Sequence, residues 1–163
     1  MNFLVTIDEF LKNHQNLCIN YFTLEKYPVK LSEIQELNYD SLFENNTIAL
    51  ANQKIHNCEW NTPVEILPNF LLTKIETDFF KLKEIDLPPI HLVYYDCFGA
   101  RVQPDLWEKP LFEIVKNKMQ KEGLLTTYSS KGSVRRILQE LGFQVEKLEG
   151  PKGKREMLNA ILC

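Results

Sequence analysis

The sequence lacks the patterns that mark several common protein classes. Its four cysteines form no Cys-x-x-Cys pair, and His56 and Cys58 have no second pair of ligands to join, so we expect reduced thiols and no zinc site. No run approaches the ~18 apolar residues of a membrane span, and no basic region precedes a long apolar stretch at the N-terminus, which predicts a cytoplasmic protein without a membrane partner. The absence of Gly-x-Gly-x-x-Gly argues against a nicotinamide-dependent dehydrogenase.

The composition is that of an ordinary globular domain with an uneven charge distribution. With 163 residues, 44% of them hydrophobic and 25% charged, the chain is long enough for one domain with a sizeable core. The net charge of −3 hides ten lysines and arginines against four glutamates in residues 116–155, a local charge of +6 that leaves −9 on the remainder. A basic C-terminal third is typical of a protein with a polyanionic partner, although a solvated helix face and a charged hairpin would give the same pattern.

Hydrophobic spacing predicts helices and strands that alternate along the chain. Residues 38–69 are mixed, polar and interrupted by prolines, and they give no clear signal. The last two strands flank a Gly/Pro turn, which predicts an antiparallel hairpin. The expected helices are 3–14, 31–37, a segment from Pro110 to Gly123, and 134–141; the expected strands are 17–24, 70–76, 90–95, 124–128, 143–148 and 154–162.

Two acidic residues that follow apolar runs are the first candidates for a functional site. Asp96 leaves the run 90–95, which predicts a buried strand, and ligands of α/β sheets bind outside the carboxyl ends of the strands. Glu25 follows the run 17–24, at a position where an acidic residue commonly accepts hydrogen bonds from ribose hydroxyls. The alternatives are that Asp96 merely caps the next turn and that Glu25 caps a helix.

Six short motifs place these residues in a family context. Around Asp96 the chain has Asp-Cys-Phe-Gly-Ala at 96–100 and Pro-Asp-Leu-Trp at 104–107. The other motifs are Leu-Glu-Lys-Tyr-Pro at 24–28, Thr-Asp-Phe at 77–79, Ser-Lys-Gly-Ser-Val-Arg-Arg-Ile-Leu at 130–138 and Gly-Lys-Arg-Glu-Met at 153–157. Together they resemble the methyltransferases that complete the 5-methylaminomethyl-2-thiouridine modification of bacterial tRNA. That family has glycine where this chain has Cys97 and proline where it has Ala100.

The resemblance implies a class I methyltransferase fold, an α/β, Rossmann-like sheet with an antiparallel C-terminal strand pair, formed by a single methyltransferase-like domain over residues 1–163. The family carries a glycine-rich turn after its first strand, whereas this sequence starts with Met-Asn-Phe-Leu at 1–4. We therefore expect a sheet lacking its first strand and an N-terminally incomplete domain. Such a chain would show a gap or a strained direct pairing between 17–24 and 90–95, would be poorly soluble, and would bind cofactor weakly.

The resemblance also implies a reaction, the transfer of a methyl group from S-adenosylmethionine to the primary amine of 5-aminomethyl(-2-thio)uridine at the tRNA wobble position. Glu25 would hold the ribose of this cofactor, with Asp78 and Phe79 at the adenine edge, although an aspartate after a strand is also an ordinary turn residue. Asp96 would accept a hydrogen bond from the amine and help to take its proton, and Phe98 would pack against the acceptor base.

The partner implied by the resemblance is tRNA. Some members of the family carry a fused flavin-dependent oxidase, for which 163 residues leave no room, so that oxidase would be a separate protein. The alternative function is a catalytically inactive, truncated remnant that folds or binds tRNA without turnover, while a small-molecule methyltransferase would leave the basic tail without a role. The residues expected at tRNA phosphates are Arg135, Arg136, Lys152, Lys154 and Arg155.

Overall fold

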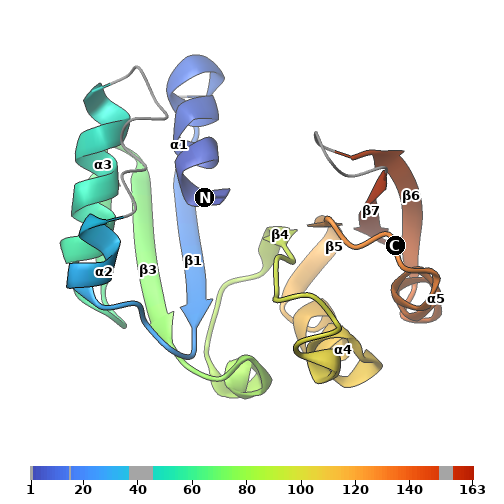
Figure 1. Cartoon of the computed structure of the whole chain (residues 1–163). Coiled ribbons are helices and arrows are strands. Elements are labelled where there is room, and N and C mark those ends of the chain that lie inside the picture. Colours follow the sequence, from blue (N-terminus) through green and yellow to red (C-terminus); the bar gives the residue numbers. More distant parts are fainter. Residues whose placement is uncertain (1, 15, 37–45, 151–155) are drawn as a thin grey trace. The chain divides into compact units, whose positions relative to one another are not determined.

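The computed structural model describes residues 2–14, 16–36, 46–150 and 156–163. The chain divides into two compact units, Met1–Phe79 and Phe80–Cys163, each with a sheet of its own (Figure 1). No helix in these described ranges is long and apolar enough to cross a membrane. The assignment of residues 1–163 to a single domain stays a prediction.

The first unit packs helices against a three-stranded sheet of order β1-β3-β2, in which β1 and β3 are parallel and β2 is antiparallel to β3. The ring of Phe70, fully buried on β3, is surrounded by three other aromatic rings from α1 and β1 at centroid distances of 5.3 to 6.3 Å. Apolar burial of this kind supplies most of the stability of a small unit. The elements are α1 (Asn2–Asn13), β1 (Ile19–Glu25), α2 (Leu31–Gln35), α3 (Asn46–Asn57), β2 (Pro63–Leu67) and β3 (Phe70–Glu76).

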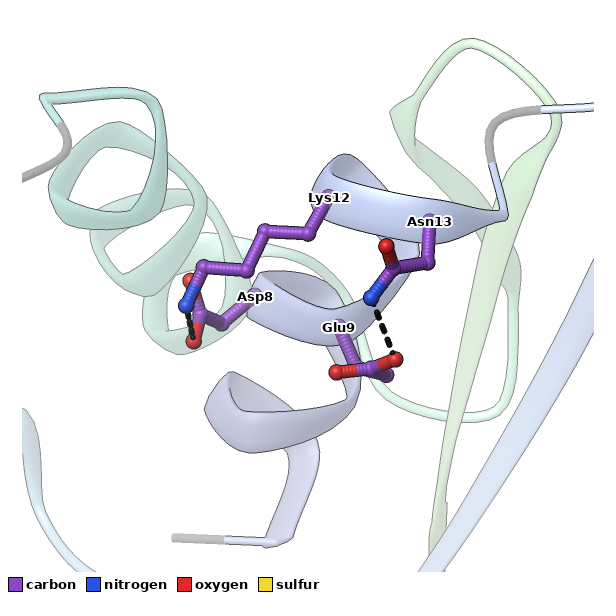
Figure 2. Close-up of polar contacts among 4 residues, drawn as sticks. All are labelled: Asp8, Glu9, Lys12 and Asn13. Atoms are coloured by element: carbon purple, nitrogen blue, oxygen red, sulfur yellow. Dashed lines mark hydrogen bonds and ion pairs between the residues drawn. The ribbon is translucent and has the colours of Figure 1, made fainter.

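Helix α1 is amphipathic, as its spacing of apolar residues predicts. Polar pairs one turn apart line its outer side (Figure 2): Lys12 Nζ lies 2.6 Å from Oδ2 of Asp8, and the side-chain amide of Asn13 donates to Oε1 of Glu9 at 2.7 Å. Pairs at this spacing add only a few tenths of a kcal/mol each, ~0.2–0.5 kcal/mol, so the buried side fixes the helix in place. The buried side consists of Leu4, Ile7 and Phe10.

A buried lysine joins β3 to the end of α3. The side chain of Lys74 is 5% exposed, and its Nζ donates to the carbonyl of Ile55 in the last turn of α3 at 2.7 Å. The same ammonium lies 4.8 Å from the centroid of the Trp60 ring. A cation suits the carbonyl end of a helix, and both contacts offset the cost of burying its charge.

The second unit is built on a four-stranded sheet of order β4-β5-β7-β6. Strands β4 and β5 are parallel, whereas β7 is antiparallel to both β5 and β6, which confirms the predicted antiparallel C-terminal pair. Helix α5 ends before Gly142, whose φ of +88° lies in the left-handed region that glycine accepts. The elements are η2 (Phe79–Glu84), β4 (Ile90–Tyr94), η3 (Pro104–Trp107), α4 (Lys109–Lys116), β5 (Met119–Thr127), α5 (Gly132–Glu140), β6 (Phe143–Glu149) and β7 (Glu156–Leu162).

The prediction of one helix from Pro110 to Gly123 is wrong in its second half. Pro110 does lie in the first turn of α4, but this helix ends at Lys116, and Met119 already belongs to β5, paired with Ile90. A Cβ at Gly123 would come within 3.1 Å of the carbonyl oxygen of Ile90, so the glycine permits a close approach of two backbones. The pairing of β4 with β5 is irregular at this point.

Among the described residues, strands β1 and β4 each pair with a single neighbour, so each lies at the edge of its sheet. The prediction that residues 90–95 form a buried strand is wrong, because Leu92 and Tyr94 on β4 are 41% and 40% exposed. An apolar run indicates burial only when the sheet continues on both sides of the strand. The arrangement expected between residues 17–24 and 90–95 stays a prediction, because the two strands belong to different units.

Candidate functional site

The carboxyl ends of β1 and β3 bring two predicted cofactor residues to one edge of the first sheet. The strands are parallel and in register, with Glu25 beside Glu76 at their last residues. The amide of Thr77 donates to the carbonyl of Glu25 at 3.0 Å, so the backbone pairing continues just past the end of β3. Asp78 follows directly, and Glu25 and Asp78 therefore lie on neighbouring strand ends.

The carboxylate of Glu25 has one oxygen fixed by the backbone and, among the described residues, one oxygen without a donor. Its Oε1 accepts a hydrogen bond from the backbone amide of Tyr27 at 2.9 Å, which fixes the side chain against the turn that follows β1. Oε2 accepts no hydrogen bond from any residue in the described parts of the chain. A carboxylate with one oxygen anchored and the other open is suited to a ligand hydroxyl.

An ion pair connects the turn after β1 with the turn after β3. Lys26 Nζ lies 2.6 Å from Oδ2 of Asp78, and the hydrogen bond to Asp78 raises the pKa of Lys26 above its ordinary value. Lys26 belongs to the motif at 24–28, but the sequence analysis gave it no role at the site. Phe79, the third residue predicted at the cofactor, is partly buried where η2 begins.

The loop after β4 carries the two predicted catalytic residues, both in the second unit. The amide of Tyr95 donates to the carbonyl of Thr126 on β5 at 2.8 Å, and the chain then leaves the sheet in the segment that we call the 96–99 loop. Asp96 is exposed, and the Phe98 side chain is 71% exposed. A carboxylate and an aromatic ring are therefore both accessible at the carboxyl edge of two parallel strands, where α/β proteins bind ligands.

Side chains from other parts of the second unit bind the backbone of the 96–99 loop. The hydroxyl of Tyr128 donates to the carbonyl of Cys97 at 2.5 Å, and Nε1 of Trp107 donates to the carbonyl of Phe98 at 2.7 Å. Trp107 is 5% exposed, so its ring belongs to the packed interior of the second unit. Its hydrogen bond to the loop, and the role of Tyr128, were not predictable from spacing.

Burial raises the proton affinity of groups around the loop. It raises the pKa of the Cys97 thiol to about 11; a hydrogen bond with Tyr95 opposes this rise, and the charge of Asp96 adds to it. Burial also raises the pKa of Tyr128, with smaller contributions from Asp96 and Cys97. Both side chains thus keep their protons at neutral pH. The φ of Cys97 is not positive, so a cysteine in place of the family's glycine causes no left-handed strain.

The cysteines take no part in a metal site within the described ranges. No group of three or more His, Cys, Asp and Glu side chains there is placed to hold a metal ion, and all four cysteines are free thiols. Cys58, which is close to His56 in the sequence, packs against the core of the first unit and donates its thiol to the carbonyl of Ile55 at 3.2 Å.

Two of the five predicted tRNA-binding residues lie where the structure describes them. Arg135 and Arg136 are exposed on α5, which begins shortly after the carboxyl end of β5 and therefore starts at the same edge of the sheet as the 96–99 loop. Their side chains give this edge positive charge. The other three predicted residues, Lys152, Lys154 and Arg155, lie outside the described residues.

Curated relatives of the chain include two proteins named tRNA 5-methylaminomethyl-2-thiouridine biosynthesis bifunctional protein MnmC. The protein of Pseudoalteromonas atlantica is 30% identical and aligns with 100% of this chain and 25% of its own length. The protein of Pseudoalteromonas translucida is 28% identical over 86% of this chain and 22% of its own length. The chain thus spans about a quarter of the length of the curated relatives that it matches.

Among solved structures, the crystal structure of MNMC2 from Aquifex aeolicus matches 98% of this chain and 48% of its own chain, with a TM-score of 0.75 and 22% sequence identity. This likeness confirms the predicted α/β fold. A family model for S-adenosyl-L-methionine-dependent methyltransferases matches residues 69–162, more than half of the chain. The match includes β3, the turn with Asp78, the 96–99 loop and α5. The chain belongs to the S-adenosyl-L-methionine-dependent methyltransferase family.

Proposed function

We propose that the chain methylates the primary amine of 5-aminomethyl(-2-thio)uridine at the wobble position of tRNA, with S-adenosylmethionine as the methyl donor. The observation that carries the proposal is the 96–99 loop, on which an exposed Asp96 and an exposed Phe98 lie at the carboxyl edge of parallel strands. Family membership supports the cofactor, and the names of the two curated relatives support tRNA as the substrate class.

The residues at the ends of β1 and β3 fit this cofactor, which when bound supplies an activated methyl group. Glu25 offers its open Oε2 to a ribose hydroxyl, the role that an acidic residue at this strand end has in nucleotide-binding α/β folds. Asp78 and Phe79 would border the adenine, and the ion pair with Lys26 keeps the Asp78 carboxylate at this edge. These three residues lie in the first unit.

Asp96 would act as the proton acceptor. An alkyl amine is protonated at neutral pH, and only the neutral form has a lone pair with which to attack a methyl carbon. Asp96 would accept a hydrogen bond from the amine and take one proton to its carboxylate. The neutral nitrogen that Asp96 leaves would accept the methyl group that S-adenosylmethionine supplies when bound. Phe98 would hold the uridine by stacking, a contact worth ~1–3 kcal/mol per base.

The basic residues would bind the tRNA backbone. Arg135 and Arg136 lie exposed on α5, and Lys152, Lys154 and Arg155 add to the local charge of residues 116–155. Contacts between arginine or lysine and phosphate give affinity without sequence preference, so the choice of nucleoside would fall to the 96–99 loop. The oxidation that exposes the primary amine would be carried out by a flavin-dependent oxidase.

The test is transfer of a labelled methyl group from S-adenosylmethionine to two tRNAs that differ in one group. One carries 5-aminomethyl-2-thiouridine, and the control carries the same nucleoside with its amine blocked by a carboxymethyl group. We expect label in the first tRNA alone, at the wobble nucleoside, as identified by digestion and mass spectrometry. Equal labelling of both tRNAs, labelling at another nucleoside, or no labelling of either would contradict the proposal.

A further inference from the structure

Three successive carbonyl groups in the 96–99 loop accept hydrogen bonds from within the protein. The carbonyl of Cys97 accepts one from Tyr128 and the carbonyl of Phe98 accepts one from Trp107. The carbonyl of Gly99 accepts two, from the amides of residues 102 and 103 at 2.8 and 3.2 Å. The hydroxyl of Tyr128 and the indole of Trp107 thus attach two consecutive peptide groups of the loop to the rest of the second unit.

We propose that Tyr128 and Trp107 are positioning residues for methyl transfer, which hold Phe98 and the neighbouring Asp96 in one orientation before tRNA binds. This inference rests on the proposed function and deepens it, because it names the two residues that fix the orientation of the residues facing the substrate. Peptide groups are planar, so a bond to the carbonyl of Cys97 and another to that of Phe98 fix the planes before and after the Phe98 Cα. The direction in which the exposed ring leaves the backbone is fixed with them.

The donors are themselves held by aromatic packing in the second unit. The Trp107 ring lies edge to face with Tyr95 and Tyr128 at centroid distances of 5.4 and 5.8 Å. Tyr95 stacks on Phe112 at 4.5 Å, and its hydroxyl donates to the carbonyl of Leu106, next to Trp107. The loop is therefore attached to the buried core of the second unit through donors that have little freedom to move.

Tyr128 remains a donor over the working pH range. Burial and the negative charge of Asp96 both raise the pKa of its hydroxyl, so the proton that bonds to the Cys97 carbonyl is retained. Asp96 directly precedes Cys97, whose carbonyl Tyr128 binds, so the carboxylate lies next to this anchor along the chain. Groups held in their reacting positions by a second set of residues gain rate through orientation, and small misplacements can cost as much as ~10²-fold.

Replacing Tyr128 with phenylalanine removes the hydroxyl and keeps the ring against Trp107. Losing one hydrogen bond of ordinary strength predicts a single-turnover methylation rate about 3- to 10-fold lower at saturating tRNA and cofactor. We expect unchanged affinity for S-adenosylmethionine, an unchanged melting temperature, and faster hydrogen exchange in the peptide containing residues 96–103. Tyr21→Phe, the same chemical change in the first unit, is the matched control and should alter neither the rate nor the exchange of this peptide.

Trp107→Phe removes the second donor and should lower the methylation rate further. If a variant has a lower melting temperature than the wild type, the test for that variant is the hydrogen exchange of the loop alone. A Tyr128→Phe protein with wild-type rate and wild-type exchange would overturn the inference. So would a lower rate explained entirely by weaker cofactor binding or a lower melting temperature, since that would be a structural role. If the wild type fails to methylate tRNA while Tyr128→Phe still loosens the loop, the proposed function fails and the anchoring of the loop stands.

Discussion

Replacing Glu25 with alanine tests the cofactor site at the end of β1. One oxygen of this carboxylate, Oε1, is engaged by the backbone amide of Tyr27, and Oε2 is the oxygen left for a ligand. The substitution therefore removes one charged acceptor from the proposed ribose site. The hydrogen bond to Tyr27 is exposed, so its amide returns to water and the first unit should lose little stability.

The expected loss of cofactor affinity follows from the single carboxylate oxygen that is removed from the proposed ribose site. A hydrogen bond to a charged group contributes about 1.5–3 kcal/mol, and every 1.4 kcal/mol changes Kd about tenfold. Loss of one such bond predicts a Kd for S-adenosylmethionine about 10- to 150-fold higher. Loss of two would exceed this range, which would mean that Oε1 leaves Tyr27 to bind the cofactor.

Isothermal titration calorimetry with S-adenosylmethionine measures the change, and Glu76→Ala provides the matched control. Glu76 lies beside Glu25 in the register of β1 and β3, is exposed, and is not proposed to touch cofactor. We expect wild-type affinity for Glu76→Ala and a lower affinity for Glu25→Ala. Equal Kd values for both variants would refute the assignment of the ribose to Glu25.

Two further predictions concern the second unit. Because burial raises the pKa of Cys97 from 9.0 to about 11, its thiolate fraction at pH 8 should be roughly a hundredfold below that of an unshifted thiol. Alkylation by iodoacetamide, followed by mass spectrometry, should therefore be far slower at Cys97 than at the exposed Cys18. The rate at Cys97 should increase with pH up to about pH 11. Equal rates at pH 8 would show that Cys97 is not buried. Replacing both Arg135 and Arg136 by glutamine should reduce the slope of log K for tRNA binding against log salt concentration by about 1.4 to 1.8. An unchanged slope would mean that the two arginines only form a solvated helix face and do not contact phosphates.

The spacing of apolar residues correctly predicted the helices and strands that bury one continuous face. Helix α1, strands β1 and β3 and the C-terminal strand pair lie within a few residues of their predicted ranges, because each packs a regular apolar side against a core. Helix α3 and strand β2 were missed for the opposite reason. The buried residues of α3 are Ile48 and Ala51, and β2 begins at Pro63 on the edge of its sheet, so neither leaves a clear pattern.

The burial of β4 and the end of α4 depend on neighbours that spacing does not reveal. The apolar run at 90–95 is typical of a strand with two partners, but in the part of the chain that the structure describes β4 pairs with β5 alone and exposes Leu92 and Tyr94. Gly123 resembled a helix-ending glycine. Its actual requirement is the close approach of the Ile90 carbonyl, a contact with a distant part of the chain.

The sequence predicted that the candidate residues lie at strand ends, and it did not predict the contacts that hold them there. Motif positions located Glu25 and Asp96 at strand ends, where parallel pairing places them at sheet edges. The hydrogen bond from Tyr128 to the 96–99 loop joins residues 31 positions apart, and the ion pair of Lys26 with Asp78 joins two different turns. The packing of the core decides which donor binds which acceptor, and local secondary-structure propensity does not predict these pairs.

The most direct measurement of the central claim is single-turnover methylation of tRNA by Asp96→Asn, with cofactor and tRNA both saturating. Asp86→Asn, at an exposed position in the same unit, is the matched control. If Asp96 takes the proton of the wobble amine, the asparagine variant should bind S-adenosylmethionine normally and transfer its methyl group about 10²-fold more slowly or worse, while Asp86→Asn keeps the wild-type rate. A near wild-type rate for Asp96→Asn would remove Asp96 from the reaction and contradict the account.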